Sequence, residues 1–386
     1  MWLVMALFIA AAQANAIEQP TTASMAAPRG AFSCDGHRAV GGRCEAAITC
    51  WPDSAPVMPA PVPSASVREH SLGQQGGFRG RTDVLQVVAA VAGNCILNAN
   101  VAQIASMHPP GYVHVIVTPD TTGCEQLRSK WSHVRCLGDS DVLGVGVSVA
   151  SIQSALAAVG EQSRAKGAAW FLQQMLKMGA VALGVGGLGE HVRIMDGDSV
   201  TLRPSDWFTA AGNEIFDTCD RDTLTVGDGL NHVRYGALWY NLTGLPLVGS
   251  PALIAHGMST RRTHMRTLLQ AMSPPGRNWR SAAWVAHSLG RMCDYAAVTG
   301  FSEYYYYASW VLGRSANETA AANGSALAAP PLVRVPQVCQ RFSAPPHTGD
   351  GTPAIKIASY LAAKHPTLAY VVIEDHASRK RGKQSS

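Results

Sequence analysis

The chain has 386 residues, of which 47% are hydrophobic and 15% charged, so it is long and apolar enough to bury a large core. Its formal net charge is only +5, and much of that charge lies in a basic tail at residues 377–386. No other basic run is interleaved with aromatic residues, which argues against a nucleic-acid-binding protein.

Residues 1–16, MWLVMALFIAAAQANA, have the form of a secretory signal peptide. An apolar run of about a dozen residues precedes the small-residue pattern Ala14-Asn15-Ala16. The run is too short to cross a bilayer comfortably, so we expect a leader, with an uncleaved signal anchor as the alternative. Its start departs from the usual leader in having no Lys or Arg. No later stretch reaches about 18 uninterrupted apolar residues, and we therefore expect no further membrane span.

Glycosylation sequons and cysteines agree with a secretory route. Sequons begin at Asn241, Asn317 and Asn323. The nine cysteines are candidates for disulfides in an oxidising compartment, and their odd number leaves at least one unpaired or intermolecular. They stand at positions 34, 44, 50, 95, 124, 136, 219, 293 and 339. We expect the protein in the ER or Golgi lumen or outside the cell.

Residues 17–81 are rich in Pro, Ala, Ser and Gly, which is typical of an arm or stem. Its cysteines (34, 44 and 50) either close a small loop-rich module or tie this arm to the main domain. Order signals begin at about residue 82, and we place the main domain at 82–376.

Strand and helix patterns alternate at the start of that domain. Strands are predicted at 84–91, 114–118 and 132–136, and helices at 94–107 and 124–131. This alternation predicts βαβ units, right-handed crossovers and an α/β/α three-layer sandwich with a mostly parallel central sheet.

The clearest helix is Ala168–Val181, whose apolar residues Phe171, Leu172, Met175, Leu176 and Met178 share one face. That stripe is interpreted as core. Lys177 precedes an acidic strand, where it either faces a phosphate of the substrate or is an ordinary solvated lysine.

The segment His191–Pro204, HVRIMDGDSVTLRP, is the centre of the prediction. Val192 and Ile194 alternate with polar residues in a short strand that leads into Asp196-Gly197-Asp198. Two carboxylates at a strand end can share a divalent cation, and an oxygen-lined, open site suits Mg²⁺ or Mn²⁺. The alternative is that Asp-Gly-Asp is only a hairpin turn.

Two other motifs favour structural interpretations. Gly184–Gly189 matches Gly-x-Gly-x-x-Gly but follows a helix and precedes a strand, so it predicts a loop and not a dinucleotide site. Ala286–Gly290 resembles a nucleophile elbow with Ser288 at its centre. Because the segment 279–295 is predicted to be a helix with no preceding strand, a serine hydrolase is kept only as an alternative.

The remaining elements follow the same alternation. Strands are predicted at 246–256 and 368–373, helices at 260–271 and 355–364, and an exposed loop at 316–329.

A further helix is expected to start at Ser302 and continue to residue 312, with Glu303 in its first turn before four tyrosines. Glu303 is either a partner of the helix dipole or a carboxylate suited to a sugar hydroxyl. His376, at the end of the last strand, is either a surface histidine or a group that returns to the metal.

The assembled pattern resembles the GT-A class of nucleotide-sugar glycosyltransferases, and more narrowly an uncharacterised glycosyltransferase-like domain family of bacteria and algae. Four segments carry the resemblance: Trp170–Lys177 (WFLQQMLK), Met195–Pro204 (MDGDSVTLRP), Ser250–Arg262 (SPALIAHGMSTRR) and Phe301–Tyr307 (FSEYYYY). It extends over roughly residues 82–376 and implies a GT-A-like fold. The placement of Gly197 between the aspartates departs from the usual pattern.

The resemblance implies roles for individual residues. Asp196, Asp198 and His376 would bind Mn²⁺ or Mg²⁺, with Asp198 coordinating directly and Asp196 touching the metal through water or the donor ribose. Glu303 would be a general base or position the acceptor. Lys177, Gln174 and His256 are expected to contact the substrate.

The resulting prediction is a metal-dependent glycosyltransferase that uses a nucleotide-sugar donor and an unknown glycan, protein or lipid acceptor. The main alternative is a non-catalytic carbohydrate- or nucleotide-binding protein on the same fold. A serine hydrolase that uses Ser288 is the third.

Overall fold

The structure is a computed structural model. The chain divides into two compact units, residues 1–55 and residues 56–386, and every residue described belongs to the second unit. The leader, the three cysteines of the arm, Asn323 and His376 lie outside the described residues. The described residues are 78–91, 94–108, 111–158, 167–219, 227–248, 256–294, 301–321, 332–343 and 369–374.

The main sheet has the strand order β3-β2-β1-β4-β7. Its first four members run parallel to their neighbours, and β7 pairs antiparallel with β4. β1 and β2 are buried almost throughout, as expected for parallel strands that are covered on both faces. The strands are β1 (Thr82–Val87), β2 (His114–Val117), β3 (Val134–Leu137), β4 (His191–Asp196) and β7 (Gly257–Arg261).

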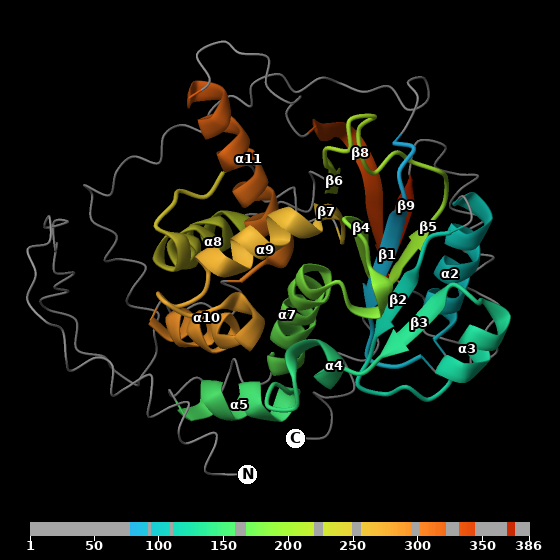
Figure 1. The fold of residues 1–386 in the computed structure, drawn as a ribbon, viewed down its shortest axis with the longest axis horizontal. Helices are drawn as coiled ribbons and strands as arrows, with labels where there is room; N and C mark the ends of the chain where they lie inside the picture. Colours follow the sequence, from blue (N-terminus) through green and yellow to red (C-terminus); the bar gives the residue numbers. More distant parts are fainter. Residues whose placement is uncertain are drawn as a thin grey trace, which may run out of the picture. The chain divides into compact units, whose positions relative to one another are not determined.

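Helices cover both faces of this sheet (Figure 1). α2 (Cys95–Met107) and α3 (Cys124–Lys130) pack on one face, where Ile116 and Val134 belong to their core cluster. The opposite face, with Val115 among its residues, packs against α7 (Ala168–Leu183). The three-layer, mostly parallel α/β architecture predicted from the sequence is confirmed. A disulfide between Cys124 and Cys136 links α3 to β3.

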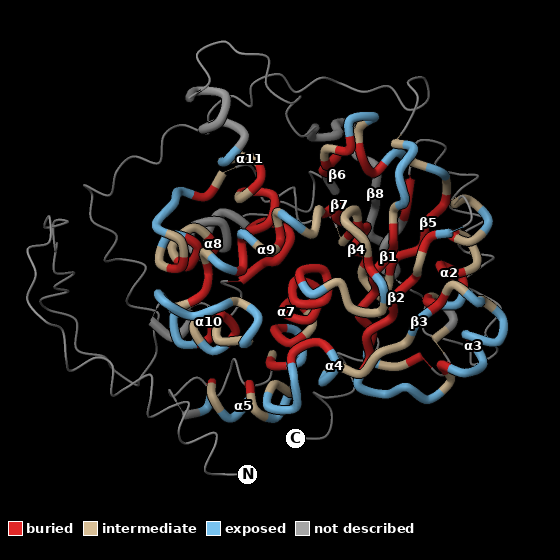
Figure 2. Tube along the Cα trace, viewed as in Figure 1, coloured by how far each residue is buried: buried red, intermediate tan, exposed pale blue. Residues whose placement is uncertain are grey.

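Helix α7 is the central helix of the second face. It is buried over most of its length, as Figure 2 shows, because α4, α5, α9 and β1 surround it. It ends at Gly184, whose left-handed backbone (φ 71°) favours glycine. The Gly-x-Gly-x-x-Gly segment is therefore the connection between α7 and β4, as predicted.

The other helices pack around α7 and the sheet (Figure 1). They are α4 (Ser140–Leu143), α5 (Val149–Ala158), α8 (Gly227–Thr243), α9 (Arg262–Ala271), α10 (Ala283–Asp294) and α11 (Glu303–Ala321), with short 3₁₀ turns η2 (Val185–Gly187) and η5 (Trp279–Ser281).

A second sheet has the order β5-β9-β8-β6. Its strands are β5 (Ser199–Thr201), β6 (Ile215–Cys219), β8 (Leu332–Ser343) and β9 (Tyr370–Glu374). Because β4 lies in the first sheet and β5 in the second, Asp-Gly-Asp joins two sheets and is not the turn of a hairpin. β6, β8 and α8 are not among the elements predicted from the sequence.

Three element predictions need correction. Of the strand expected at 246–256, residues 246–248 and 256 are not in a strand, residues 249–255 lie outside the described residues, and the next strand, β7, begins at Gly257. Thr260 and Arg261 consequently belong to β7 and not to the following helix. The loop expected at 316–329 is helical up to Ala321, because α11 continues without a break. The helix expected at 355–364 lies outside the described residues.

The surroundings of Ser288 and Asn241 do not favour a nucleophile at the first or glycosylation at the second. Ser288 lies inside α10, and its buried Oγ has no hydrogen-bond partner among the described residues, so it has neither the exposed turn nor the adjacent base of a nucleophile elbow. Asn241 lies within α8, and its Nδ2 is buried, which keeps this sequon from an external enzyme in the folded state. Within the described ranges, none of the helices combines the length and apolar character needed to cross a bilayer.

Candidate functional site

The Asp-Gly-Asp turn lies where the strand order of the main sheet reverses. From β1 the chain proceeds to β2 on one side, whereas β4 lies on the other, and Asp196 is the register partner of Val87 at the end of β1. In open parallel sheets, ligands bind beyond the carboxyl ends of the strands at such a switch point. The fold therefore places both aspartates where a ligand site is expected.

Gly197 is required by the close packing of this turn. A Cβ atom at this position would lie 2.6 Å from Cγ1 of Val88 and 3.3 Å from the carbonyl oxygen of Val87. Any larger residue would push the turn away from β1. The glycine that departs from the usual motif thus lets the two aspartates flank the end of β1.

Asp196 has polar partners at both carboxylate oxygens. Oδ1 accepts hydrogen bonds from the ammonium of Lys177 and from the hydroxyl of Tyr304, the latter at 2.6 Å. Oδ2 lies 2.7 Å from Nδ1 of His256. Burial favours the neutral acid, but Lys177 and His256 outweigh it and hold the pKa of Asp196 well below its usual range. Asp196 is therefore ionised and enclosed by donors.

Lys177 is buried, with a side chain only 3% exposed. Its Nζ also contacts Oε1 of Glu303 at 2.7 Å and the hydroxyl of Tyr304 at 3.2 Å. Burial alone would lower the pKa of Lys177, but the two carboxylates outweigh it and raise that pKa. The three hydrogens of the ammonium thus have protein partners, and Lys177 faces carboxylates where the sequence pattern suggested a phosphate.

Glu303 begins helix α11, as predicted, and Ser302 caps that helix by accepting the backbone N–H of Tyr305 at 3.4 Å. Burial raises the pKa of Glu303, and the nearby Lys177 offsets part of that rise. Oε1 of Gln174 accepts the backbone N–H of Glu303 at 3.2 Å. Gln174 therefore holds the start of α11 in place. Its predicted contact with the substrate stays a prediction, as does the general-base role of Glu303.

His256 is held in an uncommon backbone conformation immediately before β7. Its φ of 54° lies in the left-handed region, which costs free energy for a residue with a side chain. Its carbonyl oxygen accepts the backbone N–H of Asp196 at 2.9 Å and the hydroxyl of Ser199 at 3.3 Å. These two bonds fix His256 against the Asp-Gly-Asp turn, and so they offset the strain.

Asp196, Asp198 and His256 form the one cluster among the described residues that could hold a metal ion. They offer ligand atoms that lie within 4.8 Å of one another. Oδ1 of Asp198 and Nε2 of His256 are buried and have no hydrogen-bond partner. Burial, and then the charge of Asp196, raises the pKa of Asp198 to about 6. Unpartnered buried oxygen and nitrogen atoms beside a second carboxylate fit a divalent cation.

The two histidines of the sequence prediction have different outcomes. His376, the predicted metal ligand, lies outside the described residues, so its assignment stays a prediction. His256, predicted to contact the substrate, lies beside the aspartates because β7 pairs with β4, with Gly257 the partner of Met195. No local pattern indicates a pairing between residues that are 60 positions apart in the chain.

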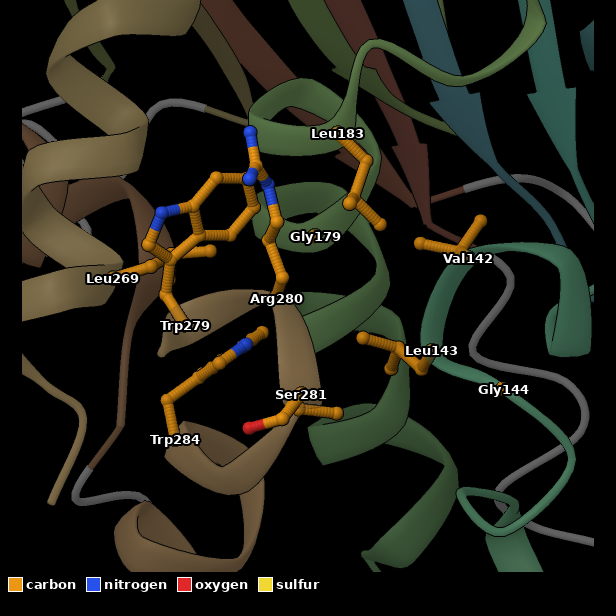
Figure 3. A pocket seen from close by; sticks show the side chains of 11 residues that line it. Val142, Leu143, Gly144, Gly179, Leu183, Leu269, Trp279, Arg280, Ser281 and Trp284 are labelled. Carbon is orange, nitrogen blue, oxygen red and sulfur yellow. The ribbon is translucent and has the colours of Figure 1, made fainter. Parts of the chain in front are cut away.

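A cavity of about 190 Å³ is lined by none of these site residues (Figure 3). Its walls come from α4, α7, α9, η5 and α10 and are mainly apolar, with Leu143, Leu269 and Trp284 among them. The guanidinium of Arg280 lies over the ring of Trp279, 5.3 Å from its centroid. Because its lining contains no carboxylate or histidine, this cavity lacks the groups for metal binding or acid–base chemistry.

Comparisons with known proteins give no family for this chain. No family model matches the sequence, and no curated protein matches it. Three solved glycosyltransferase structures are similar in parts of their chain course. A structure of an active-site mutant of LgtC is 11% identical in sequence, with a TM-score of 0.36. The match covers 75% of this chain and 86% of the LgtC chain.

The galactosyltransferase LgtC with donor and acceptor sugar analogues is 9% identical with a TM-score of 0.34, at coverages of 76% and 88%. The bifunctional glycosyltransferase WbbM is 11% identical with a TM-score of 0.28, at coverages of 78% and 47%. At these scores the likeness identifies neither a family nor an activity for this chain.

Proposed function

We propose that this protein is a metal-dependent glycosyltransferase that uses a nucleotide-sugar donor. The observation that carries the proposal is a metal-like group of Asp196, Asp198 and His256 at the switch point of the sheet, in which Oδ1 of Asp198 and Nε2 of His256 are buried and have no hydrogen-bond partner. The resemblance of four sequence segments to GT-A enzymes supports the same interpretation.

The residues that would hold the cation are Asp198 and His256, with Asp196 beside them. An imidazole in an otherwise oxygen-donating set favours Mn²⁺ over Mg²⁺, which prefers oxygen ligands alone. When bound, such a cation supplies Lewis-acid chemistry and charge neutralisation for the diphosphate leaving group of the donor. The few protein ligands leave room for phosphate oxygens.

The overall reaction would break the bond between the sugar anomeric carbon and the diphosphate oxygen, and form one to an acceptor hydroxyl, which loses its proton. Glu303 is the carboxylate proposed to take that proton or to position the acceptor. Glu303 is ion-paired with Lys177 in the buried network. Replacement of Glu303 by Gln keeps the size of the side chain and removes the carboxylate, and so it tests both roles. Unchanged turnover of that variant would exclude Glu303 from the reaction.

The test is a thermal-shift screen of the purified protein with UDP-, GDP- and CMP-sugars, each with Mn²⁺ or with EDTA. Ligands that bind only the native state raise its stability by RT ln(1 + [L]/Kd), so even a weak donor is detectable. We expect one nucleotide class to stabilise the protein in the presence of Mn²⁺. Release of nucleoside diphosphate with an acceptor library then measures transfer.

Asp198→Asn is the decisive variant for that screen, because it removes one anionic ligand with little change of shape. It should abolish the Mn²⁺-dependent shift and reduce transfer by at least about 1,000-fold, if each lost metal contact is worth several kcal/mol. Glu214→Gln is the matched control, since Glu214 lies in a separate buried cluster. Full activity of Asp198→Asn would overturn the metal-dependent mechanism.

A non-catalytic carbohydrate- or nucleotide-binding protein is the second outcome of the same screen. Nucleotide-dependent stabilisation without transfer to any acceptor would favour it. Absence of any response to nucleotide and metal would remove both hypotheses.

We further propose a secretory location, supported by the form of residues 1–16 and by the cysteine content. N-terminal sequencing of the protein secreted by a eukaryotic host tests it, with cleavage after Ala16 as the expected result.

A further inference from the structure

Asp196 is the most heavily contacted group of the candidate metal site. Lys177 and Tyr304 occupy Oδ1, and His256 contacts Oδ2 through Nδ1. The side chain is only 14% exposed. A metal ion that bound Asp196 would therefore compete with an ammonium, a hydroxyl and an imidazole for the same two oxygens.

The contact with Asp196 also selects a form of His256. A carboxylate oxygen accepts a hydrogen bond, so Nδ1 of His256 donates and carries the hydrogen. In the neutral imidazole the lone pair then lies on Nε2, which is the buried atom without a partner. Asp198 belongs to the same metal-like group of residues, and its Oδ1 is also buried and without a partner. The lone pairs left for a cation are thus on His256 and Asp198.

Asp196 has a cationic partner within the protein. Lys177 forms ion pairs with Asp196 and with Glu303, and it is buried together with them. Charges in such surroundings interact more strongly than charges in water. Lys177 offsets one of the two negative charges of Asp196 and Glu303, whereas Asp198 has no ion pair among the described residues, so its carboxylate is the one left for a cation.

We propose that Asp196 is a positioning residue that holds His256 with Nε2 toward the cation, and that Asp198 and His256 are the protein's direct metal ligands. This inference rests on the proposed function only for the presence of a cation. Carboxylates that accept the second N–H of a metal-binding histidine fix its tautomer and orientation in this way. Lys177 and Tyr304 in turn hold Asp196.

The competing arrangement has Asp196 and Nδ1 of His256 both coordinating the metal, with the hydrogen bond between them lost. The two arrangements differ in which imidazole nitrogen of His256 coordinates the metal, and in whether Nδ1 keeps its hydrogen. Long-range ¹H–¹⁵N spectra of the protein labelled with ¹⁵N-histidine, recorded at pH 8 before and after addition of Zn²⁺ as a diamagnetic probe, distinguish them. His256→Gln assigns the resonances by difference.

We expect the Nδ1–H tautomer of His256 in the metal-free protein, and a Zn²⁺-induced shift at Nε2 with Nδ1 still protonated. Deprotonation of Nδ1 on addition of Zn²⁺, or an Nε2–H tautomer in the free protein, would overturn the inference. His264, which contacts Glu214 through Nδ1 at 2.8 Å, is the internal control and should not shift.

Calorimetric titration with Mn²⁺ provides the second measurement. Asp196→Asn should weaken binding by about 10- to 100-fold, as for other groups that orient a metal-binding histidine, whereas Asp198→Asn should weaken it by more. Equal losses in the two variants would contradict the assignment. Circular dichroism of each variant checks that it is folded.

These readouts are independent of transfer. A Zn²⁺ shift at Nε2 without any glycosyl transfer would support the inference and count against the proposed function. Glycosyl transfer by a protein that coordinates the metal through Nδ1 of His256 would support the proposed function and overturn the inference.

Discussion

Asp196 and Glu214 have the same two kinds of partner within one protein. Each accepts a hydrogen bond from a tyrosine of α11, Tyr304 at 2.6 Å or Tyr307 at 2.7 Å, one helical turn apart. Each also contacts Nδ1 of a histidine, His256 at 2.7 Å or His264 at 2.8 Å. We call them the Asp196 cluster and the Glu214 cluster.

The difference lies in what surrounds these contacts. The Asp196 cluster includes a buried lysine and has a second aspartate beside it, and His256 keeps an unpartnered buried nitrogen. The Glu214 cluster has no second carboxylate in a metal-like group within the described residues, and the side chain of His264 is 29% exposed. A carboxylate that orients a histidine is therefore not by itself a metal site. The added Asp198 makes the Asp196 cluster a candidate metal site.

The largest stability effect is expected from Lys177→Met, which affects the Asp196 cluster alone. It leaves Asp196 and Glu303 as buried carboxylates without their shared cation, and breaking a buried ion pair in this way typically costs about 3–5 kcal/mol of unfolding free energy. Urea denaturation measures the loss. Lys130→Met is the control, because α3 exposes Lys130 and it should change little.

Adding Glu303→Gln to Lys177→Met should restore part of this loss, since one of the two unpaired charges is then removed. If the Lys177→Met variant is as stable as wild type, water must solvate Asp196 and Glu303 in place of Lys177. The Asp196 cluster would then not be buried as described.

In contrast to Lys177→Met, Asp198→Asn should raise the free energy of unfolding of the metal-free protein. Burial and the charge of Asp196 raise the pKa of Asp198 from 3.8 to about 6. The folded state thus binds more protons than the unfolded state between these values, and stability falls as pH rises through that window. At about 1.4 kcal/mol per pKa unit, ionised Asp198 destabilises the fold by up to about 3 kcal/mol at pH 7.5.

The amide of Asn carries no charge, so the variant should unfold at a higher temperature than wild type at pH 7.5 with EDTA, and the gain should vanish below pH 4. The matched Glu214→Gln variant should instead lose stability. A destabilised Asp198→Asn would indicate that Asp198 has stabilising partners in the free protein.

Tyr304→Phe and Tyr307→Phe compare the two clusters directly. Each removes a hydroxyl that donates to a buried carboxylate, a bond worth about 1.5–3 kcal/mol. Each hydroxyl also accepts one hydrogen bond, from Lys177 at 3.2 Å for Tyr304 and from the backbone N–H of Arg261 at 2.6 Å for Tyr307, so the two losses of stability should be similar. Only Tyr304→Phe should also weaken Mn²⁺ binding, by a few-fold. An equal effect of both variants on Mn²⁺ affinity would erase the distinction between the clusters.

The smallest effect concerns the acid stability that Glu214 contributes. Burial acts to raise the pKa of Glu214, but the hydrogen bond and charge of His264 and the hydrogen bond of Tyr307 lower it below 4.5. The unfolded state therefore binds more protons in the window below pH 4.5, and the contribution of Glu214 is complete above that pH and is lost as pH falls. Melting curves of Glu214→Gln between pH 5 and 3 should show a weaker pH dependence than wild type.

Local sequence patterns predicted the main secondary-structure elements and the fold class of this protein. The apolar face of Ala168–Val181 predicts the buried helix α7, the alternation from residue 82 predicts the parallel sheet, and the Asp-Gly-Asp segment marks the end of β4. The start of α11 at Glu303 follows from the capping residue Ser302. These features depend on residues that are close in the chain, where periodicity and capping report directly on burial and hydrogen bonding.

Only the tertiary structure decided how the site is assembled. His256 reaches Asp196 through the pairing of β7 with β4, and Glu303 reaches Lys177 across 126 positions of the chain. The sequence pattern predicts Lys177 as either a phosphate contact or a surface residue. Its burial excludes the surface residue, its contact with two carboxylates was not foreseen, and the phosphate contact stays a prediction. A single chain gives the identity of each charge but not its distant partner, because that partner is set by sheet register and helix packing together.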